Sequence, residues 1–299
     1  IFDTELSARL LGMNRVGLGP VVEELLGVHL KKEHSAADWS TRPLPQSWLT
    51  YAALDVELLV DLRDALEALL IESGKRQWAQ EEFDASLSKP DKPAIAEPWR
   101  KLSGLHTLSK PQQLAIARSL WNARDQLAQD RDISPGRLIP DSSITAVSKL
   151  SLTSMKQMAN VKEFSGRASR SELPLWWNAY VLGSIDKDLP VMRIQSDSIP
   201  APRVWAEKNP AAFQRLTRAK EMIHSTAEEL QLPVENLLTP SILREVSWSP
   251  PDEVTPESVS AKLSQLGARS WQIEITSPLI SRAFVEAHQK IEQNLPVDS

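Results

Sequence analysis

Two proline-marked stretches divide this 299-residue sequence into three segments. Residues 88–98 hold three prolines among alternating charges, and residues 199–203 hold two more prolines. Proline at this density is typical of linkers rather than of packed elements. Elsewhere the apolar residues recur at helical spacing, and the chain has 21 Pro against 10 Gly. The sequence therefore predicts helices separated by proline-marked joints, arranged in two or three domains.

Composition argues against several classes of protein. The chain has no cysteine, so it has no disulfide, thiol nucleophile or zinc–thiolate site, and a reducing cytoplasmic location is expected. No apolar run approaches the ~20 residues of a membrane-spanning helix, so no membrane partner is expected. No glycine-rich phosphate loop is present, so no nucleotide cofactor is expected. The sequence does not fix the oligomeric state, for which a monomer is the expectation.

One helix is predicted from Pro45 to about Ser73, ended by Gly74. Within it Tyr51 and Asp55 are one turn apart, so they share a face, with Cβ atoms about 5–6 Å apart. Burying a carboxylate in such an apolar segment is costly unless a metal or a hydrogen bond compensates it. The pair alone leaves two interpretations open: an exposed Asp with a Tyr at the edge of the core, or a catalytic pair.

The motifs around this pair resemble the ribonuclease D family, which belongs to the DEDD-type 3′–5′ exonucleases that carry a tyrosine. The resemblance is continuous over about the first 75 residues. It rests on Ile1-Phe2-Asp3-Thr4, on Leu10-Leu11-Gly12, on residues 22–27, on residues 38–44 and on residues 51–55.

The resemblance implies that Asp55 is a metal-ligand carboxylate and that Tyr51 helps to position the attacking water. Such sites hold two divalent ions about 3.5–4 Å apart, and oxygen ligands suit Mg²⁺ or Mn²⁺. Trp39 and Arg42 match the family and are candidates for the substrate path, although a packing and ion-pair role is equally open for them.

Three of the four carboxylates of a DEDD site lie, in the family, upstream of the strand that corresponds to Ile1-Phe2. Asp3 does not replace them, because in the family it is a neighbour of the site. The chain is therefore expected to be a fragment that is inactive as it stands. Residues 1–87 would be the C-terminal part of an RNase H-like α/β exonuclease domain.

The remainder resembles helical HRDC modules, which occur in RecQ-type helicases and after the nuclease in ribonuclease D. Residues 99–183 follow the 88–98 linker and contain the loop 130–141, the most recognisable part of such a module. Residues 232–240 repeat the pattern of residues 133–141, which indicates a second, degenerate HRDC-like bundle at 204–295 after a linker at 184–203. The expected fold is thus mainly α, with a helical exonuclease part followed by two all-α bundles.

Charge is distributed unevenly along the chain, whose net charge is −5. Residues 1–96 hold 10 basic and 16 acidic residues and residues 184–299 hold 12 and 16, but residues 97–183 hold 12 and 7. Basic side chains and helix N-termini are what a phosphate backbone requires. A nucleic-acid-binding surface is therefore expected, with a solvated cationic face as the alternative, at a basic cluster of Lys149, Lys156, Lys162, Arg167 and Arg170.

The expected function is a 3′–5′ exoribonuclease acting on RNA 3′ ends, with tRNA precursors as the family's usual substrate. The alternative is a non-catalytic helical protein that binds nucleic acid. The presence of both Tyr51 and Asp55 favours the enzyme, because a decayed nuclease would often have lost one of them.

Overall fold

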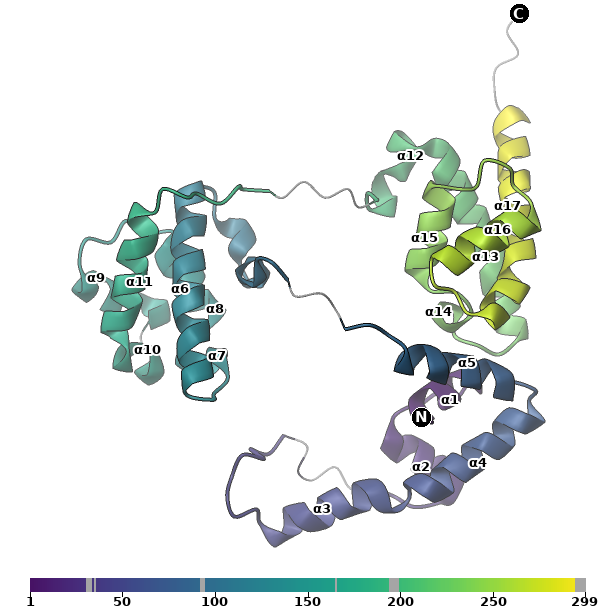
Figure 1. Ribbon diagram of the computed structural model, residues 1–299, viewed down its shortest axis with the longest axis horizontal. Helices are drawn as coiled ribbons and strands as arrows, with labels where there is room; N and C mark the ends of the chain where they lie inside the picture. The colour runs from purple at the N-terminus through teal and green to yellow at the C-terminus, as the bar shows by residue number, and fades with distance from the viewer. Residues whose placement is uncertain (31–33, 35, 92–94, 165, 194–198, 294–299) are drawn as a thin grey trace, which may run out of the picture. The chain divides into compact units, whose positions relative to one another are not determined.

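The computed structural model describes residues 1–30, 34, 36–91, 95–164, 166–193 and 199–293. Throughout these ranges the ordered elements are helices, and no strand occurs among them (Figure 1). The chain forms two compact units. Ile1–Pro90 joins Ser198–Ser299 in what we call the joined unit, and Asp91–Asp197 forms the inserted unit. None of the helices in the described ranges is long and apolar enough to cross a membrane.

The joined unit takes helices from both ends of the sequence. From the first end come α1 (Thr4–Leu10), α2 (Leu18–Leu26), α3 (Gln46–Glu57), α4 (Leu59–Glu72) and α5 (Arg76–Leu87). From the second come η4 (Pro202–Val204), α12 (Trp205–Lys208), α13 (Pro210–Glu229), α14 (Val234–Leu237), α15 (Pro240–Trp248), α16 (Pro256–Gln265) and α17 (Ser270–Gln293).

The first residues differ from the sequence expectation. Ile1 and Phe2 form no strand, and the Phe2 ring instead packs on Phe83 with 4.9 Å between centroids. Thr4 is the first residue of α1, and Asp3 caps this helix, because its carboxylate accepts the Leu6 N–H at 3.0 Å. Asp and Thr are both favoured as helix caps. Because they are adjacent here, the sequence leaves the start of α1 uncertain by one residue.

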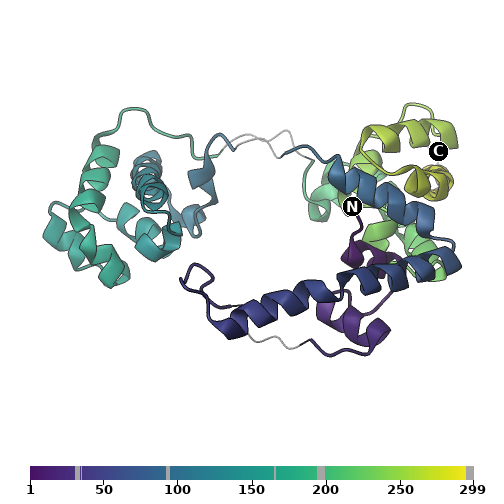
Figure 2. The same cartoon turned by 60° about the horizontal axis from the view of Figure 1, so that its bottom comes forward.

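The single helix expected from Pro45 to about Ser73 is two helices, α3 and α4, which meet at Leu58. Leu58 has φ −94° and ψ 2°, outside the helical region. Leu62, Leu66 and Leu70 of α4 are buried, whereas α3 buries no residue. In both views α3 runs on from α4 in nearly the same direction, beyond the helices on which α4 packs (Figures 1 and 2).

One apolar core links the two ends of the chain. It includes Phe83 of α5 together with Trp205, Ile223 and Phe284 from the C-terminal helices, all at most 2% exposed. Where α1 ends, Gly12 has φ +72° and lies so close to the Gln231 carbonyl that a Cβ at this position would overlap it. The N-terminal segment and the C-terminal helices are therefore packed as one body.

Buried charges complete this contact. The ammonium of Lys75 donates to the Leu10 carbonyl at 2.8 Å and to the Leu230 carbonyl at 2.7 Å. These carbonyls lie at the C-terminal ends of α1 and α13, where carbonyls lack intrahelical partners and where a cation is favourable. Glu82, 7% exposed, accepts the Trp271 indole N–H at 3.2 Å and pairs with Arg269 at 3.2 Å.

The inserted unit has a core of its own, which includes Trp99, Leu120, Ile144 and Trp176. Gly183 allows α6 and α11 to cross closely, because a Cβ there would lie 2.6 Å from the Ile116 Cα. The elements are η1 (Pro98–Lys101), η2 (Leu105–Thr107), α6 (Pro111–Asp130), α7 (Pro135–Leu138), α8 (Asp141–Ser148), α9 (Met155–Ala159), η3 (Lys162–Phe164), α10 (Arg167–Ser171) and α11 (Leu173–Ile185).

The internal repeat expected from the sequence is present. Helices α6 and α13 have 20 residues each, and each leads through a residue with positive φ, Asp132 or Gln231, into a four-residue helix. The four-residue helices α7 and α14 are followed by α8 and α15 respectively. The chain thus contains two helical bundles built on one pattern.

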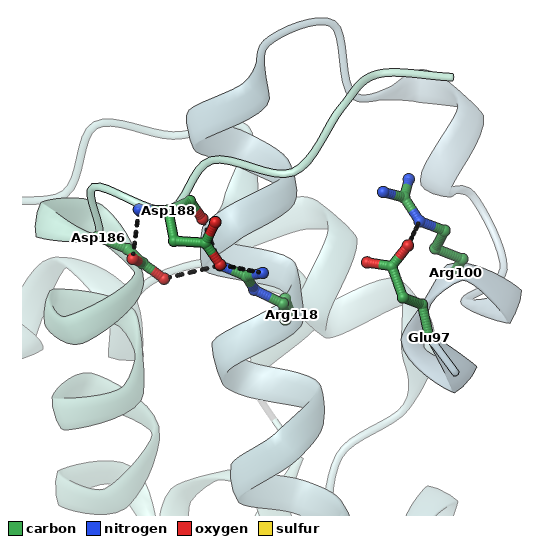
Figure 3. Close-up of polar contacts among 5 residues, drawn as sticks. All are labelled: Glu97, Arg100, Arg118, Asp186 and Asp188. Atoms are coloured by element: carbon green, nitrogen blue, oxygen red, sulfur yellow. Dashed lines mark hydrogen bonds and ion pairs between the residues drawn. The ribbon is translucent and has the colours of Figure 1, made fainter. Parts of the chain in front are cut away.

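The two ends of the inserted unit are fixed by arginines (Figure 3). Arg118 of α6 pairs with Asp186 at 2.9 Å and with Asp188 at 3.1 Å, just after α11. Arg100 pairs with Glu97 at 2.7 Å and donates to the Val191 carbonyl at 3.1 Å. Arg100 therefore connects the start of this unit to its end.

Candidate active site and nucleic-acid interface

Tyr51 and Asp55 lie side by side on α3, both half-buried. Loss of water around the phenol raises the pKa of Tyr51 above its usual range, and the charge of Asp55 and a hydrogen bond to its carboxylate add to this rise. The phenol is therefore a protonated hydrogen-bond donor at neutral pH. The pair lines a hollow of about 320 Å³, together with Val28, His29, Leu30, Ser47, Thr50 and Leu54.

Aromatic rings surround Tyr51. The Trp39 ring lies 6.2 Å from Tyr51 and 5.4 Å from Trp48, measured between centroids. The His34 ring lies 5.9 Å from Tyr51 and 5.8 Å from Trp48. Trp48 precedes Tyr51 by three residues, a spacing that puts both on one helix face. Trp48 was not among the site residues predicted from the sequence, although its spacing from Tyr51 indicates a shared helix face.

Trp39 and Arg42, the predicted substrate-path residues, belong to the turn before α3. The Trp39 indole donates to the His34 carbonyl at 3.1 Å. The Arg42 guanidinium donates to the Trp39 and Thr41 carbonyls at 2.9 and 2.8 Å. Trp39 is thus brought to the Tyr51 side chain, while Arg42 is exposed and holds the turn.

The hollow does not by itself fit a metal pair. Among the described residues Asp55 is the one carboxylate that lines it, and no group of three or more His, Asp or Glu side chains there could hold an ion. His29, also in the hollow, contacts Glu23 at 3.1 Å. Two hard cations need several oxygen ligands, so further carboxylates would have to come from elsewhere.

The basic cluster lies in the inserted unit, along the short elements between α8 and α11. Lys149 caps α8, Lys156 belongs to α9, and the other three belong to η3 and α10. All five side chains are exposed, and within the described ranges none of them forms an ion pair. The charges are therefore open to solvent and to anions.

Neighbouring Trp176 and Trp177 are not part of this exposed surface. Trp176 is fully buried in the core of the inserted unit. Trp177 is half-buried and stacks on Tyr180, with centroids 5.5 Å apart. Both rings pack within the bundle.

Three family models match the chain. Residues 1–71 match a 3′–5′ exonuclease, residues 113–179 match an HRDC domain, and residues 198–284 match a 3′ to 5′ exonuclease C-terminal domain.

Whole proteins agree with these matches. Ribonuclease D of Nitrobacter hamburgensis is 30% identical over 191 residues, which are 63% of this chain and 48% of that protein. The chain belongs to the ribonuclease D family. A ribonuclease D-type chain thus accounts for the exonuclease match, the HRDC match and their order.

Solved structures extend the likeness to almost the whole chain. A protein from Bifidobacterium adolescentis is 37% identical, with a TM-score of 0.80 over 95% of this chain and 72% of that one. RNase D of Escherichia coli has the same fold, with a TM-score of 0.57 at 22% identity over 97% of this chain and 72% of that one. The expected fold class, a helical exonuclease part with HRDC-type bundles, is confirmed.

Proposed function

We propose that this chain forms part of a 3′–5′ exoribonuclease in which Tyr51 and Asp55 belong to the active site. The main support is the contact of these two side chains in one hollow, within the residues that match a 3′–5′ exonuclease model. The protonated Tyr51 phenol donates its single O–H to Asp55 in this structure, and it can turn that O–H to a water or a phosphate oxygen beside Asp55 instead. The chain spans about half the length of the curated relatives it matches, so the activity is proposed for the protein as a whole.

Asp55 would supply one carboxylate to a centre of two divalent ions, Mg²⁺ or Mn²⁺, as in other phosphodiester hydrolases. We propose that the other carboxylates come from a segment upstream of residue 1. This is supported by apolar side chains left open to solvent on α3 and the start of α4: Leu54, which lines the hollow, and Val56 and Val60 are 43%, 61% and 62% exposed. α3 buries none of its own residues, and its exposed apolar side chains gain free energy when another part of a domain covers them.

RNA is the proposed substrate, because the curated relatives are ribonucleases. We extend the proposal to tRNA precursors through the resemblance described above, and to a role of the basic cluster in holding the RNA backbone. A cytoplasmic location and a monomeric state remain predictions.

The test is degradation of a short 5′-labelled RNA in the presence of Mg²⁺ or Mn²⁺. It compares this chain, the same chain extended upstream through a complete exonuclease domain, and the extended chain with Asp55→Asn. The matched control is Glu57→Gln, an exposed carboxylate on the same helix. We expect shortening from the 3′ end only in the extended chain and in its Glu57→Gln form.

The remaining outcomes each contradict part of the proposal. Activity of the extended Asp55→Asn variant would remove Asp55 from the site. Activity of the present chain alone would contradict the need for further carboxylates. Inactivity of every form, together with RNA binding, would favour the alternative of a non-catalytic nucleic-acid-binding protein.

A further inference from the structure

A second hollow, of about 510 Å³, lies in the C-terminal half of the joined unit, outside the Tyr51 site. Three elements form it: α13, the loop between α15 and α16, and α17. Its apolar wall comes from Pro250, Pro251, Val254 and Val285. Its volume falls within the roughly 300–1,000 Å³ typical of small-molecule pockets. It is therefore large enough for a small organic ligand.

Arg215 supplies a cation to this hollow. Its Nε donates to the Ser247 carbonyl at 2.9 Å, near the end of α15, and its guanidinium carbon lies 5.7 Å from the Phe284 ring centroid. These two contacts fix the plane of the guanidinium. The two terminal NH₂ groups have no hydrogen-bond or ion-pair partner among the described residues, and they are not sealed from solvent.

The absence of a neutralising carboxylate sets Arg215 apart. Burial lowers the pKa of Arg215 below its usual range, and no acidic neighbour offsets this effect. Arg218, one turn away, pairs with Glu221 and Glu286 at 2.9 and 2.6 Å, and these contacts raise its pKa. Asp252 also lines the hollow, but it is exposed and makes no ion pair with Arg215 in the described structure.

We propose that this hollow binds a nucleotide, with its phosphate on the Arg215 guanidinium and its base or ribose against the apolar wall. A guanidinium whose terminal nitrogens are free presents paired N–H donors that match two phosphate oxygens. The proline and valine side chains give a flat apolar surface that a base covers with little loss of side-chain entropy. The assignment rests on the proposed function, because it takes its ligand from the products or the substrate of RNA hydrolysis.

The experiment is isothermal titration calorimetry on the full chain with three probes. These are adenosine 5′-monophosphate, inorganic phosphate, and a short RNA without terminal phosphates. The key variants are Arg215→Lys and Val285→Glu. Arg215→Lys keeps the positive charge but removes the paired N–H donors, and Val285→Glu adds a negative charge at the rim of the hollow. Val285 is 43% exposed, so Val285→Gln is a matched control of similar size without charge. Arg244→Gln removes an exposed arginine of α15 that does not line the hollow.

We expect saturable binding of the mononucleotide to the unmodified chain and to both control variants. Arg215→Lys and Val285→Glu should each weaken it by about tenfold or more, a change of about 1.4 kcal/mol in binding free energy. If these two variants weaken binding of the short RNA but not of the mononucleotide, the bound nucleotide is one within a strand rather than a released product. Either result supports the site.

Three results would overturn the proposal: no saturable binding of either nucleotide probe, equal affinity in Val285→Glu and Val285→Gln, or phosphate binding as tightly as the mononucleotide. Val285 takes no part in the Arg215–Ser247 contact, so the Val285→Glu comparison does not depend on how well Arg215→Lys folds. Binding is measured without hydrolysis, so failure here is separate from failure of the Asp55 experiment.

Discussion

The indole rings of Trp78 and Trp271 stack with their centroids 4.8 Å apart and their planes 14° apart. Trp78 belongs to α5 and Trp271 to the first turn of α17. The Trp271 backbone N–H donates to Glu81 at 3.1 Å, and its indole N–H donates to Glu82. A single tryptophan therefore connects the exonuclease part to the last helix by stacking and by two hydrogen bonds.

Trp271→Ala should destabilise the joined unit. Trp271 is 2% exposed, and truncating a buried aromatic side chain to Ala costs about 3–5 kcal/mol. Urea unfolding followed by circular dichroism should show an earlier transition for this unit, with the transition of the inserted unit unchanged. Trp177→Ala, in the inserted unit, is the control and should move the other transition. A loss below about 1 kcal/mol for Trp271→Ala would contradict the role assigned to this residue.

Glu82 gives the joined unit a pH-dependent stability. Burial raises the pKa of Glu82 above its ordinary 4.5, although Arg269 and the Trp271 indole act against the rise. A raised pKa means that the folded state binds more protons, so this contribution is present below pH 4.5 and is lost as the pH rises through the folded pKa. Compared with Glu82→Gln, the unmodified chain should therefore lose free energy of unfolding as the pH rises from about 4 to 7. A constant difference across that range would contradict this.

Asp141 acts in the opposite sense in the inserted unit. Burial alone would raise the pKa of Asp141, but a 2.9 Å hydrogen bond from the Ser103 N–H and the 2.7 Å contact with Arg124 outweigh it and hold the pKa below its ordinary 3.8. The stabilisation is therefore present above pH 3.8 and is lost as the pH falls through the folded pKa. Asp141→Asn should be destabilising at neutral pH, and its deficit should shrink in acid. Urea titrations from neutral pH downwards measure this, and a deficit that grows in acid would be inconsistent with it.

The basic cluster yields a prediction about RNA. Lys156→Glu combined with Arg167→Glu should weaken RNA binding by the full-length protein and reduce the slope of affinity against salt, because fewer counterions are released. Lys101→Glu with Lys187→Glu makes the same charge change at exposed positions of the same unit, outside the cluster. Fluorescence anisotropy at several salt concentrations compares the two. Equal affinities and slopes for the two double variants would exclude a specific role for the cluster.

Local patterns in the sequence predicted the mainly helical fold and the repeat of α6 and α7 in α13 and α14. They also predicted that Tyr51 and Asp55 share a helix face, because that relationship depends on four residues of one helix. The break at Leu58 carries no proline or glycine, so it is set by the packing of α4 and was not visible in the sequence.

Long-range pairs were outside the reach of local patterns. No local pattern predicts that Lys75 and Glu82 are buried, since charged side chains are rarely buried without partners. Their partners Leu230 and Trp271 are 155 and 189 residues away. Arg215 was missed for the same reason, because its hollow is closed by a loop and a helix that follow much later in the chain.

The division of the chain into a joined and an inserted unit has a consequence for synthesis on the ribosome. Domains fold as units, with the N-terminal ones first in most proteins. Here Leu10 and Phe83 are translated before the inserted unit, but Trp205 and Phe284, which complete their core, are translated after it. The inserted unit draws its core from consecutive residues and can close as soon as α11 has left the exit tunnel. The inserted unit should therefore fold before the joined unit is complete, and the core around Leu10 and Phe83 should close only after α17 has been made.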